Sequence, residues 1–271
     1  MTKFFTIALS AFSLASFSQT PYNYSINGDL KNAPDNSYAY IHHKWDGKDF
    51  TDSAKVKAGK FAFTGKGKEP NMYWMTRSRN INEQPNLIFF IDGGKTTISA
   101  HIDSLPKAKV SGGQTQKDYN DYNTMMFGFG TRQQALVNAY NEAKNKGDAA
   151  TMNEKVAEYK GMEAEVKLAI ENFIKTHPKS AVSGYAIYYN HQNSTAPVEE
   201  LERVVALLDK SILNTKYGKL AQEKITQIRG TTIGYPALNF AQADPNGKMV
   251  NLTDLKGKYV LVDFWASWCG P

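Results

Sequence analysis

Apolar and polar residues alternate in short runs from Tyr22 to about Gly113. Such alternation is typical of strands that bury one face. The apolar positions fall at Tyr22, Tyr24 and Ile26, at Phe61 and Phe63, at Met72 and Trp74, through Leu87 to Ile91, and at Ile98, Ala100 and Ile102. Turn residues that accept positive φ stand between the runs, at Asn27-Gly28, Asp46-Gly47, Gly59, Gly65 and Asp92-Gly93-Gly94. This region is therefore predicted to form an antiparallel β-sandwich or barrel.

Beyond Gly113 the pattern changes to helical spacing. Apolar residues recur every three or four positions, which places them on one stripe of a helix, at Met152, Val156, Tyr159, Met162, Val166, Ile170 and Phe173. Thr151 and Glu154 predict a capping box at the start of this helix, and Pro178 lies beyond its end. A second stripe comprises Val198, Leu201, Val205, Leu208 and Ile212, and another helix is expected over 136–143, ended by Gly147-Asp148.

These stripes could serve a binding partner or a membrane surface instead of a core. Neither helix shows the broad basic face that membrane-surface helices favour. Packing of the helices against one another in a small bundle is therefore the preferred interpretation.

A third pattern begins at about Thr231. Leu238 and Phe240 precede the turn at 244–247, and Met249, Val250 and Leu252 follow it, which predicts a hairpin. The run from Tyr259 to Ala266 is apolar except for Asp263. Such a run is typical of a strand buried on both faces of an α/β sheet.

The first residues predict export. An apolar run from Phe4 to Phe17 follows Lys3 and ends in small residues, which is typical of a secretory signal peptide over 1–18. A membrane anchor is disfavoured because the run is shorter than the roughly 20 apolar residues that span a bilayer. No cysteine follows the run to accept a lipid. The mature protein is expected in the periplasm or cell envelope, without a transmembrane segment.

The charge pattern offers little support for a nucleic-acid partner. The 271 residues carry a formal net charge of +6, and Lys and Glu are interleaved, as in 142–146 and 163–167. Nucleic-acid binding would instead favour Lys and Arg clustered with aromatic residues. A solvated surface of mixed charge is therefore expected, with no nucleic-acid partner.

Metal and phosphate sites are not predicted either. His42 and His43 are adjacent, so on a strand they would point to opposite faces. His101, His177 and His191 lack ligand spacing, and Gly128-Phe129-Gly130 does not join a strand to a helix as a phosphate loop does. No metal and no cofactor are expected.

Cys269 is the sole cysteine of the sequence. An odd cysteine in an exported protein is reactive or pairs with another molecule. It follows the predicted buried strand, at the expected start of a helix, where free N–H groups and the helix dipole favour a thiolate. Pro271 is tolerated in a first helical turn, and Trp268 would shield the thiol and offer a polypeptide an apolar surface. An inert buried cysteine is the less favoured alternative.

The stretch from Thr232 to Pro271 resembles the start of envelope thioredoxin-like proteins, the ResA-like group of thiol-disulfide oxidoreductases, related to the alkyl-hydroperoxide-reductase family. The resemblance rests on Ile233-Gly234 with Pro236, Asn246-Gly247-Lys248, 252–257 and the sequence VLVDFWASWCGP at 260–271. It implies that Cys269 is the nucleophile and that Gly270 and Pro271 tune the redox potential. Gly270 and Pro271 are also expected to bind the substrate together with Trp268. It also implies action on protein thiols and disulfides, in a setting such as cytochrome c maturation.

The same resemblance assigns Asp263 to the buried acid that moves protons in some thioredoxins; a buried carboxylate without that role is the alternative. A second cysteine would follow Pro271 in the family's motif, so the redox domain is expected to be truncated within it and poor in turnover. A peroxidase is disfavoured because those enzymes carry threonine where this chain has Ala266.

Tyr22 to Gly113 resembles a poorly characterised β-rich module found at the N-termini of such proteins. The matching stretches are Asn27-Gly28, 52–56, 60–65 and 110–112. An α+β, multi-domain chain follows: signal peptide 1–18, β-rich module 19–113, helical region 114–230 and incomplete thioredoxin-like domain 231–271. An alternative function is non-catalytic binding through the β-rich module, with Tyr40, Trp45 and Trp74 as exposed aromatics.

Overall fold

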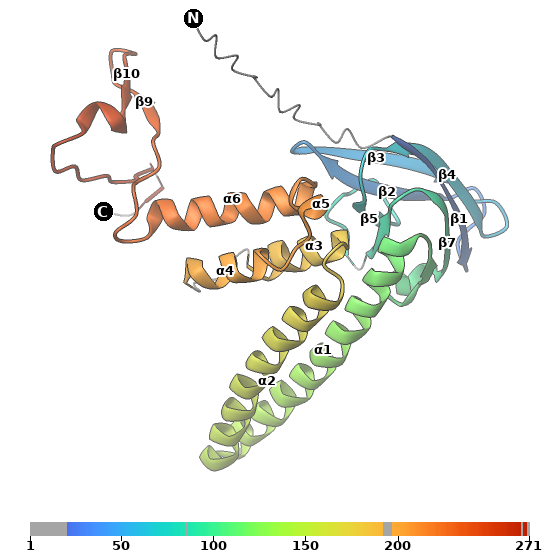
Figure 1. The fold of residues 1–271 in the computed structure, drawn as a ribbon. Coiled ribbons are helices and arrows are strands. Elements are labelled where there is room, and N and C mark those ends of the chain that lie inside the picture. The colour runs from blue at the N-terminus through green and yellow to red at the C-terminus, as the bar shows by residue number, and fades with distance from the viewer. Residues whose placement is uncertain (1–20, 85, 192–196, 267, 270–271) are drawn as a thin grey trace, which may run out of the picture.

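The computed structural model describes residues 21–269, apart from 85, 192–196 and 267, so the predicted signal peptide lies outside the described residues. The described chain is α+β, with a β-sandwich, a group of helices and a small C-terminal hairpin (Figure 1). One sheet has the order β4-β1-β7-β8 and the other the order β3-β2-β5-β6. The first contains β1 (Tyr22–Lys31), β4 (Lys60–Gly67), β7 (Gly94–His101) and β8 (Lys109–Ser111). The second contains β2 (Tyr38–Trp45), β3 (Lys48–Lys55), β5 (Asn71–Thr76) and β6 (Leu87–Ile91).

The predicted sandwich is present, but its pairing is not purely antiparallel. β1 and β7 run parallel, with Ile26 opposite Thr96 and Gly28 opposite Ile98. The other strand pairs described in the two sheets are antiparallel. A parallel pair joins strands that are distant in sequence, which alternation along one strand cannot reveal.

Two glycines predicted to lie in turns lie inside strands. Gly28 is in β1, where an added Cβ would come within 1.9 Å of the ring of Phe61, the residue paired with it on β4. Gly65 is in β4, beneath the ring of Tyr24 at 2.5 Å. These glycines make room for aromatic rings across the sheet. Asp46-Gly47 does form the predicted turn, with φ of 46° and 73°.

The helices begin with a long antiparallel pair that projects away from the sandwich (Figure 1), α1 (Gln114–Lys146) and α2 (Ala149–Thr176). Four shorter helices follow, α3 (Ala181–Asn190), α4 (Val198–Val205), α5 (Lys210–Leu213) and α6 (Lys216–Thr231). Two 3-10 helices, η1 (Ile102–Lys107) and η2 (Leu252–Leu255), and the strands β9 (Ala241–Ala243) and β10 (Met249–Asn251) complete the described elements. α3 and α6 were not predicted.

The helix termini differ from the prediction. Asp148, rather than Thr151, caps α2: its carboxylate accepts the Thr151 N–H at 3.1 Å, so the predicted capping box is wrong. Gly147 ends α1 with φ of 71°, as predicted. The second stripe is divided between α4 and α5, because the Asp209 carboxylate accepts the Ser211 N–H and begins a new helix.

The stripe on α2 is only partly buried. Met162, Ile170 and Phe173 are buried, whereas Val156 is 43% exposed. Val156 lies near the start of α2, close to the turn that joins it to α1, whereas Ile170 and Phe173 lie near its end. Bundle packing therefore covers the half of the stripe nearest the sandwich.

Strand β6 joins the sandwich to the helices. Leu87, Phe89 and Ile91 point into the sandwich core, and Phe90 points into the helical core. The backbone N–H of Phe90 donates to Oε1 of the buried Gln116 side chain of α1 at 2.7 Å. The ring of Phe90 lies 5.0 Å from that of Tyr119, 5.4 Å from Tyr185 and 6.2 Å from Tyr217, between centroids. One strand thus contributes to both cores.

We predict that Phe90→Ala lowers the free energy of unfolding by about 3–5 kcal/mol, because it empties a site that three aromatic rings surround. Phe127→Ala in α1 is the matched control, since that side chain is 74% exposed and its loss should change stability by less than about 0.5 kcal/mol. Urea unfolding of both variants measures the difference. Equal losses would show that Phe90 does not hold the two cores together.

Candidate functional site

The predicted reactive residues lie in the C-terminal segment after α6. Its hairpin pairs β9 with β10 around a turn in which the Asp244 carboxylate accepts the N–H groups of Asn246 and Lys248, each at 2.9 Å. The side chains of Asn251 and Asp254 form a capping box at η2. The predicted hairpin is therefore present, stabilised by local polar contacts.

Side chains at the end of α6 anchor this segment. The Tyr235 hydroxyl donates to Oε1 of Glu199 in α4 at 3.3 Å, and the Arg229 guanidinium lies 5.8 Å from the centre of the Tyr235 ring. Leu238 packs so closely on Gly230 that an added Cβ would come within 2.2 Å of Leu238 Cγ. The hairpin lies at the end of α6 remote from the sandwich (Figure 1).

Cys269 and Trp268 are both exposed, Trp268 to 86%. The backbone N–H of Cys269 donates to the carbonyl oxygen of Ala266 at 2.8 Å, which forms a local turn. Gly270 and Pro271 lie outside the described residues. The thiol is therefore open to solvent, beside an exposed indole.

The strand predicted over 259–266 is absent from the described structure, and the buried acid is not buried. Residues 259–265 have no regular structure, and Asp263 is exposed. A strand requires a neighbour for its N–H and C=O groups, and no described strand pairs with this run. Phe264 makes an aromatic contact with Phe240, at 6.1 Å between centroids, but no described residue over 231–269 is buried. Cys269 and Asp263 are thus not brought into a formed pocket.

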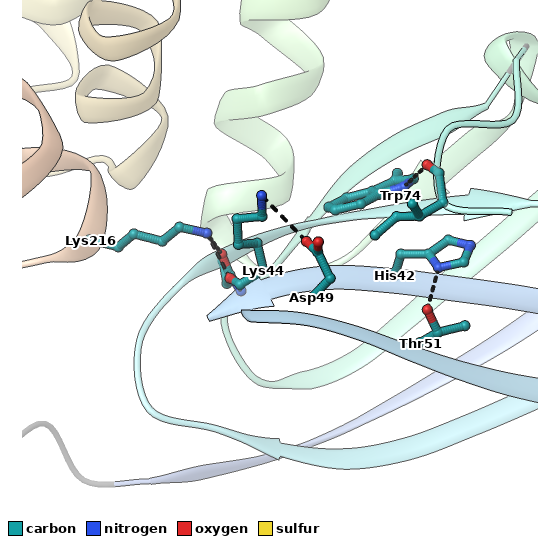
Figure 2. A network of polar contacts seen from close by, with 8 residues as sticks. His42, Lys44, Asp49, Thr51, Trp74 and Lys216 are labelled. Atoms are coloured by element: carbon teal, nitrogen blue, oxygen red, sulfur yellow. Dashed lines mark hydrogen bonds and ion pairs between the residues drawn. The ribbon is translucent and has the colours of Figure 1, made fainter. Parts of the chain in front are cut away.

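A second cluster of polar groups lies where the sandwich meets α6 (Figure 2). The Nζ of Lys216 donates to the backbone carbonyl of Lys44 and to Oδ1 of Asn71, both at 2.8 Å. The backbone N–H of Lys216 donates to Oε1 of Glu69 at 3.0 Å. This side chain links the first turn of α6 to β2 and β5. The sequence pattern did not predict these contacts of Lys216, because the residues that it contacts are 145 or more positions away in the chain.

Burial dominates the electrostatics of this cluster. It lowers the pKa of the Lys216 amine to about 8, against the opposing effect of Glu69, and it raises the pKa of the Glu69 carboxyl. The amine is held by acceptors on two strands, the Lys44 carbonyl of β2 and the Asn71 side chain of β5. We therefore interpret this cluster as a structural joint.

His42 and His43 have structural surroundings. His42 is buried, and its two ring nitrogens lie 2.8 Å from the Thr51 hydroxyl and 2.7 Å from the Thr76 hydroxyl (Figure 2). His43 packs edge-on against Tyr73, at 4.7 Å between centroids. In the described part of the chain, no group of three or more His, Cys, Asp or Glu residues could hold a metal ion.

The aromatic residues proposed for ligand binding are only partly exposed. Trp74 donates its indole N–H to the Ile81 carbonyl at 2.9 Å and stacks on His42, at 5.8 Å between centroids (Figure 2). Tyr40 makes a tilted contact with Tyr38, at 6.3 Å. Trp74 thus packs over the outer side of β2, which accounts for its position without a ligand.

Comparison with known proteins finds two kinds of similarity, one to a family of domains and one to individual proteins. Residues 24–119 match the family described as "Domain of unknown function (DUF4369)". This range covers the sandwich and ends in the first turns of α1, which carry Gln116 and Tyr119. The part of α1 that contacts β6 is thus included in the family's range.

Short stretches of the chain are similar to proteins named Thiol-disulfide oxidoreductase ResA. The Bacillus subtilis (strain 168) protein is 53% identical over 38 residues, 14% of this chain and 21% of that protein. The Bacillus anthracis protein is 51% identical over 39 residues, 14% and 22% of the two chains. The Bacillus cereus (strain ATCC 10987 / NRS 248) protein is 40% identical over 72 residues, 26% and 40%. The chain thus spans well under half the length of these relatives, and the similarity relates part of it to thiol-disulfide oxidoreductases.

In the described structure no helix combines the length and the apolar character required to cross a bilayer.

The surroundings of His43 predict a pH dependence of stability. Burial lowers the pKa of its imidazole from 6.5 to about 4, and Lys216 and His42 act in the same direction. Among the described residues its Nδ1 has no hydrogen-bond partner. The unfolded chain therefore binds a proton near pH 6.5 that the folded chain does not bind until about pH 4, so stability is lost as the pH falls through this window.

We predict that His43→Phe, which keeps the aromatic packing, loses less stability on acidification than the wild type. Between pH 6.5 and 4 its free energy of unfolding should fall by roughly 1–3 kcal/mol less. Denaturant unfolding at several pH values measures it. The variant His101→Asn, which removes a histidine from a partly exposed position, serves as the comparison. If the profile of His43→Phe parallels that of the wild type, His43 is not the titrating group.

Proposed function

We propose that this protein acts in thiol-disulfide exchange in the cell envelope, with Cys269 as the attacking group. The observation that carries the proposal is the exposed thiol of Cys269 within the sequence Trp268-Cys269-Gly270-Pro271. The short similarity to thiol-disulfide oxidoreductases supports the same chemistry. The envelope location rests on the signal peptide predicted over 1–18.

The exchange step conserves the number of disulfide bonds. The Cys269 thiol loses its proton to solvent, and the thiolate attacks one sulfur of a substrate disulfide. A bond forms between Cys269 Sγ and that sulfur while the substrate's S–S bond breaks, and the departing thiolate takes up a proton. A second thiol must then attack Cys269 Sγ to release the reduced substrate, and that thiol becomes part of a new disulfide.

Two residues beside the thiol have supporting roles in this proposal. Trp268 provides an exposed apolar surface on which a polypeptide can rest while its disulfide is attacked. Asp263 is the candidate acid for proton transfer, a role that requires its carboxyl group to be less exposed than in the described arrangement. Gly270 and Pro271 are proposed to set the redox potential.

We predict that the 271-residue chain forms one mixed disulfide with an oxidised, cystine-containing peptide and then stops, because the chain carries one cysteine. Intact-mass spectrometry should detect one adduct per chain, and none with Cys269→Ser. When two peptide halves joined by one disulfide are used, each adduct releases one half as a free thiol. Without an added thiol, the other half should stay bound to Cys269, so no further reduced peptide should accumulate.

The peptide should react faster with the protein than with free glutathione, and Trp268→Ala should slow it by about threefold to tenfold. The same variant should leave the reaction with a small aromatic disulfide unchanged. A rate equal to that of glutathione, unaffected by Trp268→Ala, would show that Cys269 is an ordinary surface thiol and would contradict the proposed function.

A further inference from the structure

The outer face of the sheet β4-β1-β7-β8 is polar and basic. Along β1 the side chains of Ile26 and Leu30 point into the sandwich core, so Asn27, Asp29 and Lys31 belong to the opposite face. The register extends this face across the sheet. Asp29 lies opposite Lys60 on one side and Ser99 on the other, and Ser99 lies opposite Lys109. The next row contains Ala62, Asn27, Thr97 and Ser111.

Positive charge predominates on this face. Its cations are the side chains of Lys31, Lys60, Lys66, Lys95 and Lys109. His101, opposite Lys31, lies 3.5 Å from the Asp103 carboxylate. The carboxylate of this face is Asp29, which the Lys60 Nζ binds at 2.6 Å. The five lysines come from four different strands, and only Lys60 and Lys66 share one, so no cluster of lysines is visible in the sequence. The sheet register brings them together.

A depression of about 420 Å³ lies between the lysines of this face. Lys60 and Lys109 border it, and its remaining polar lining consists of Asn27, Asp29, Thr97, Ser99 and Ser111. The hydroxyls of Thr97 and Ser111 lie 2.6 Å apart. Hydroxyl, amide and carboxylate groups are therefore placed between ammonium groups.

We propose that this face binds an acidic polysaccharide. The lysines match the carboxylates of such a chain, and Asn27, Ser99 and the Asp29 carboxylate can exchange hydrogen bonds with sugar hydroxyls. An anionic membrane is the weaker fit, for two reasons. A flat headgroup layer cannot enter the depression, and the face has no large exposed apolar side chain to insert into a bilayer. The occupant assigned here is thus a linear polymer bearing both hydroxyl and acidic groups.

The test is binding of the full chain to polygalacturonate at low ionic strength, measured by titration calorimetry. The double variant Lys95→Glu/Lys109→Glu should weaken binding by roughly tenfold or more, because each lost ionic contact with a polyanion costs a few-fold in affinity. The control Lys144→Glu/Lys160→Glu makes the same charge change on the exposed sides of α1 and α2 and should leave the affinity within about twofold. Circular dichroism establishes that both variants fold.

Three further probes identify the ligand chemistry. Neutral dextran should not bind, and Asn27→Ala should weaken polygalacturonate binding while leaving inorganic polyphosphate binding unchanged. The proposal is overturned if polygalacturonate does not bind, or if the two double variants lose affinity equally. It is also overturned if Asn27→Ala has no effect, or if vesicles of phosphatidylcholine and phosphatidylglycerol bind in place of the polysaccharide.

Discussion

The arrangement of the described chain depends on β6, a strand buried on both faces. Its alternating side chains supply two separate cores, since Phe89 enters the sandwich and Phe90 enters the helices. A strand in that position cannot rotate or shift by one residue without exchanging the two sets of side chains. Gln116 fixes the register further, because its side chain accepts the Phe90 N–H where β6 contacts α1. The helices are thereby packed against one sheet, and within the described residues they leave the outer face of the other sheet uncovered.

The two surfaces for which we propose chemistry lie on opposite sides of the contact between the sandwich and the helices. The basic face lies on the outside of β4-β1-β7-β8, and the segment with Cys269 follows the far end of α6 (Figure 1). Lys216 connects the near end of α6 to β2 and β5 through a buried set of hydrogen bonds. The two surfaces are therefore attached to one framework and are formed by different residues. If both proposals hold, the protein combines a polysaccharide-binding module with a thiol-exchange group.

Sequence patterns predicted elements best where the cause was local. The turn at Asp46-Gly47 and the helix end at Gly147 depend on backbone conformations that few residue types accept, and both predictions are confirmed. Gly28 and Gly65 were also predicted to lie in turns, but they lie in strands, where the lack of a side chain leaves room for the rings of Phe61 and Tyr24 on neighbouring strands. The alternation at Met72 and Trp74 correctly placed β5, yet the deeply buried side chains of this strand include Tyr73 and Met75. Both faces of β5 are covered, so alternation alone could not identify the inner one.

The sequence by itself determined the class of the fold, the change from strands to helices after Gly113, and the single cysteine with its Trp-Cys-Gly-Pro surroundings. These features depend on residue type and short-range spacing. Tertiary structure decided the parallel pairing of β1 with β7, the two-sided burial of β6, the contacts of Lys216 and the gathering of five lysines on one face. It also left the run over 259–265 without a strand partner. Each of these depends on which distant segments come into contact, because a hydrogen bond, a buried face or a charged surface requires a partner that the local sequence does not contain.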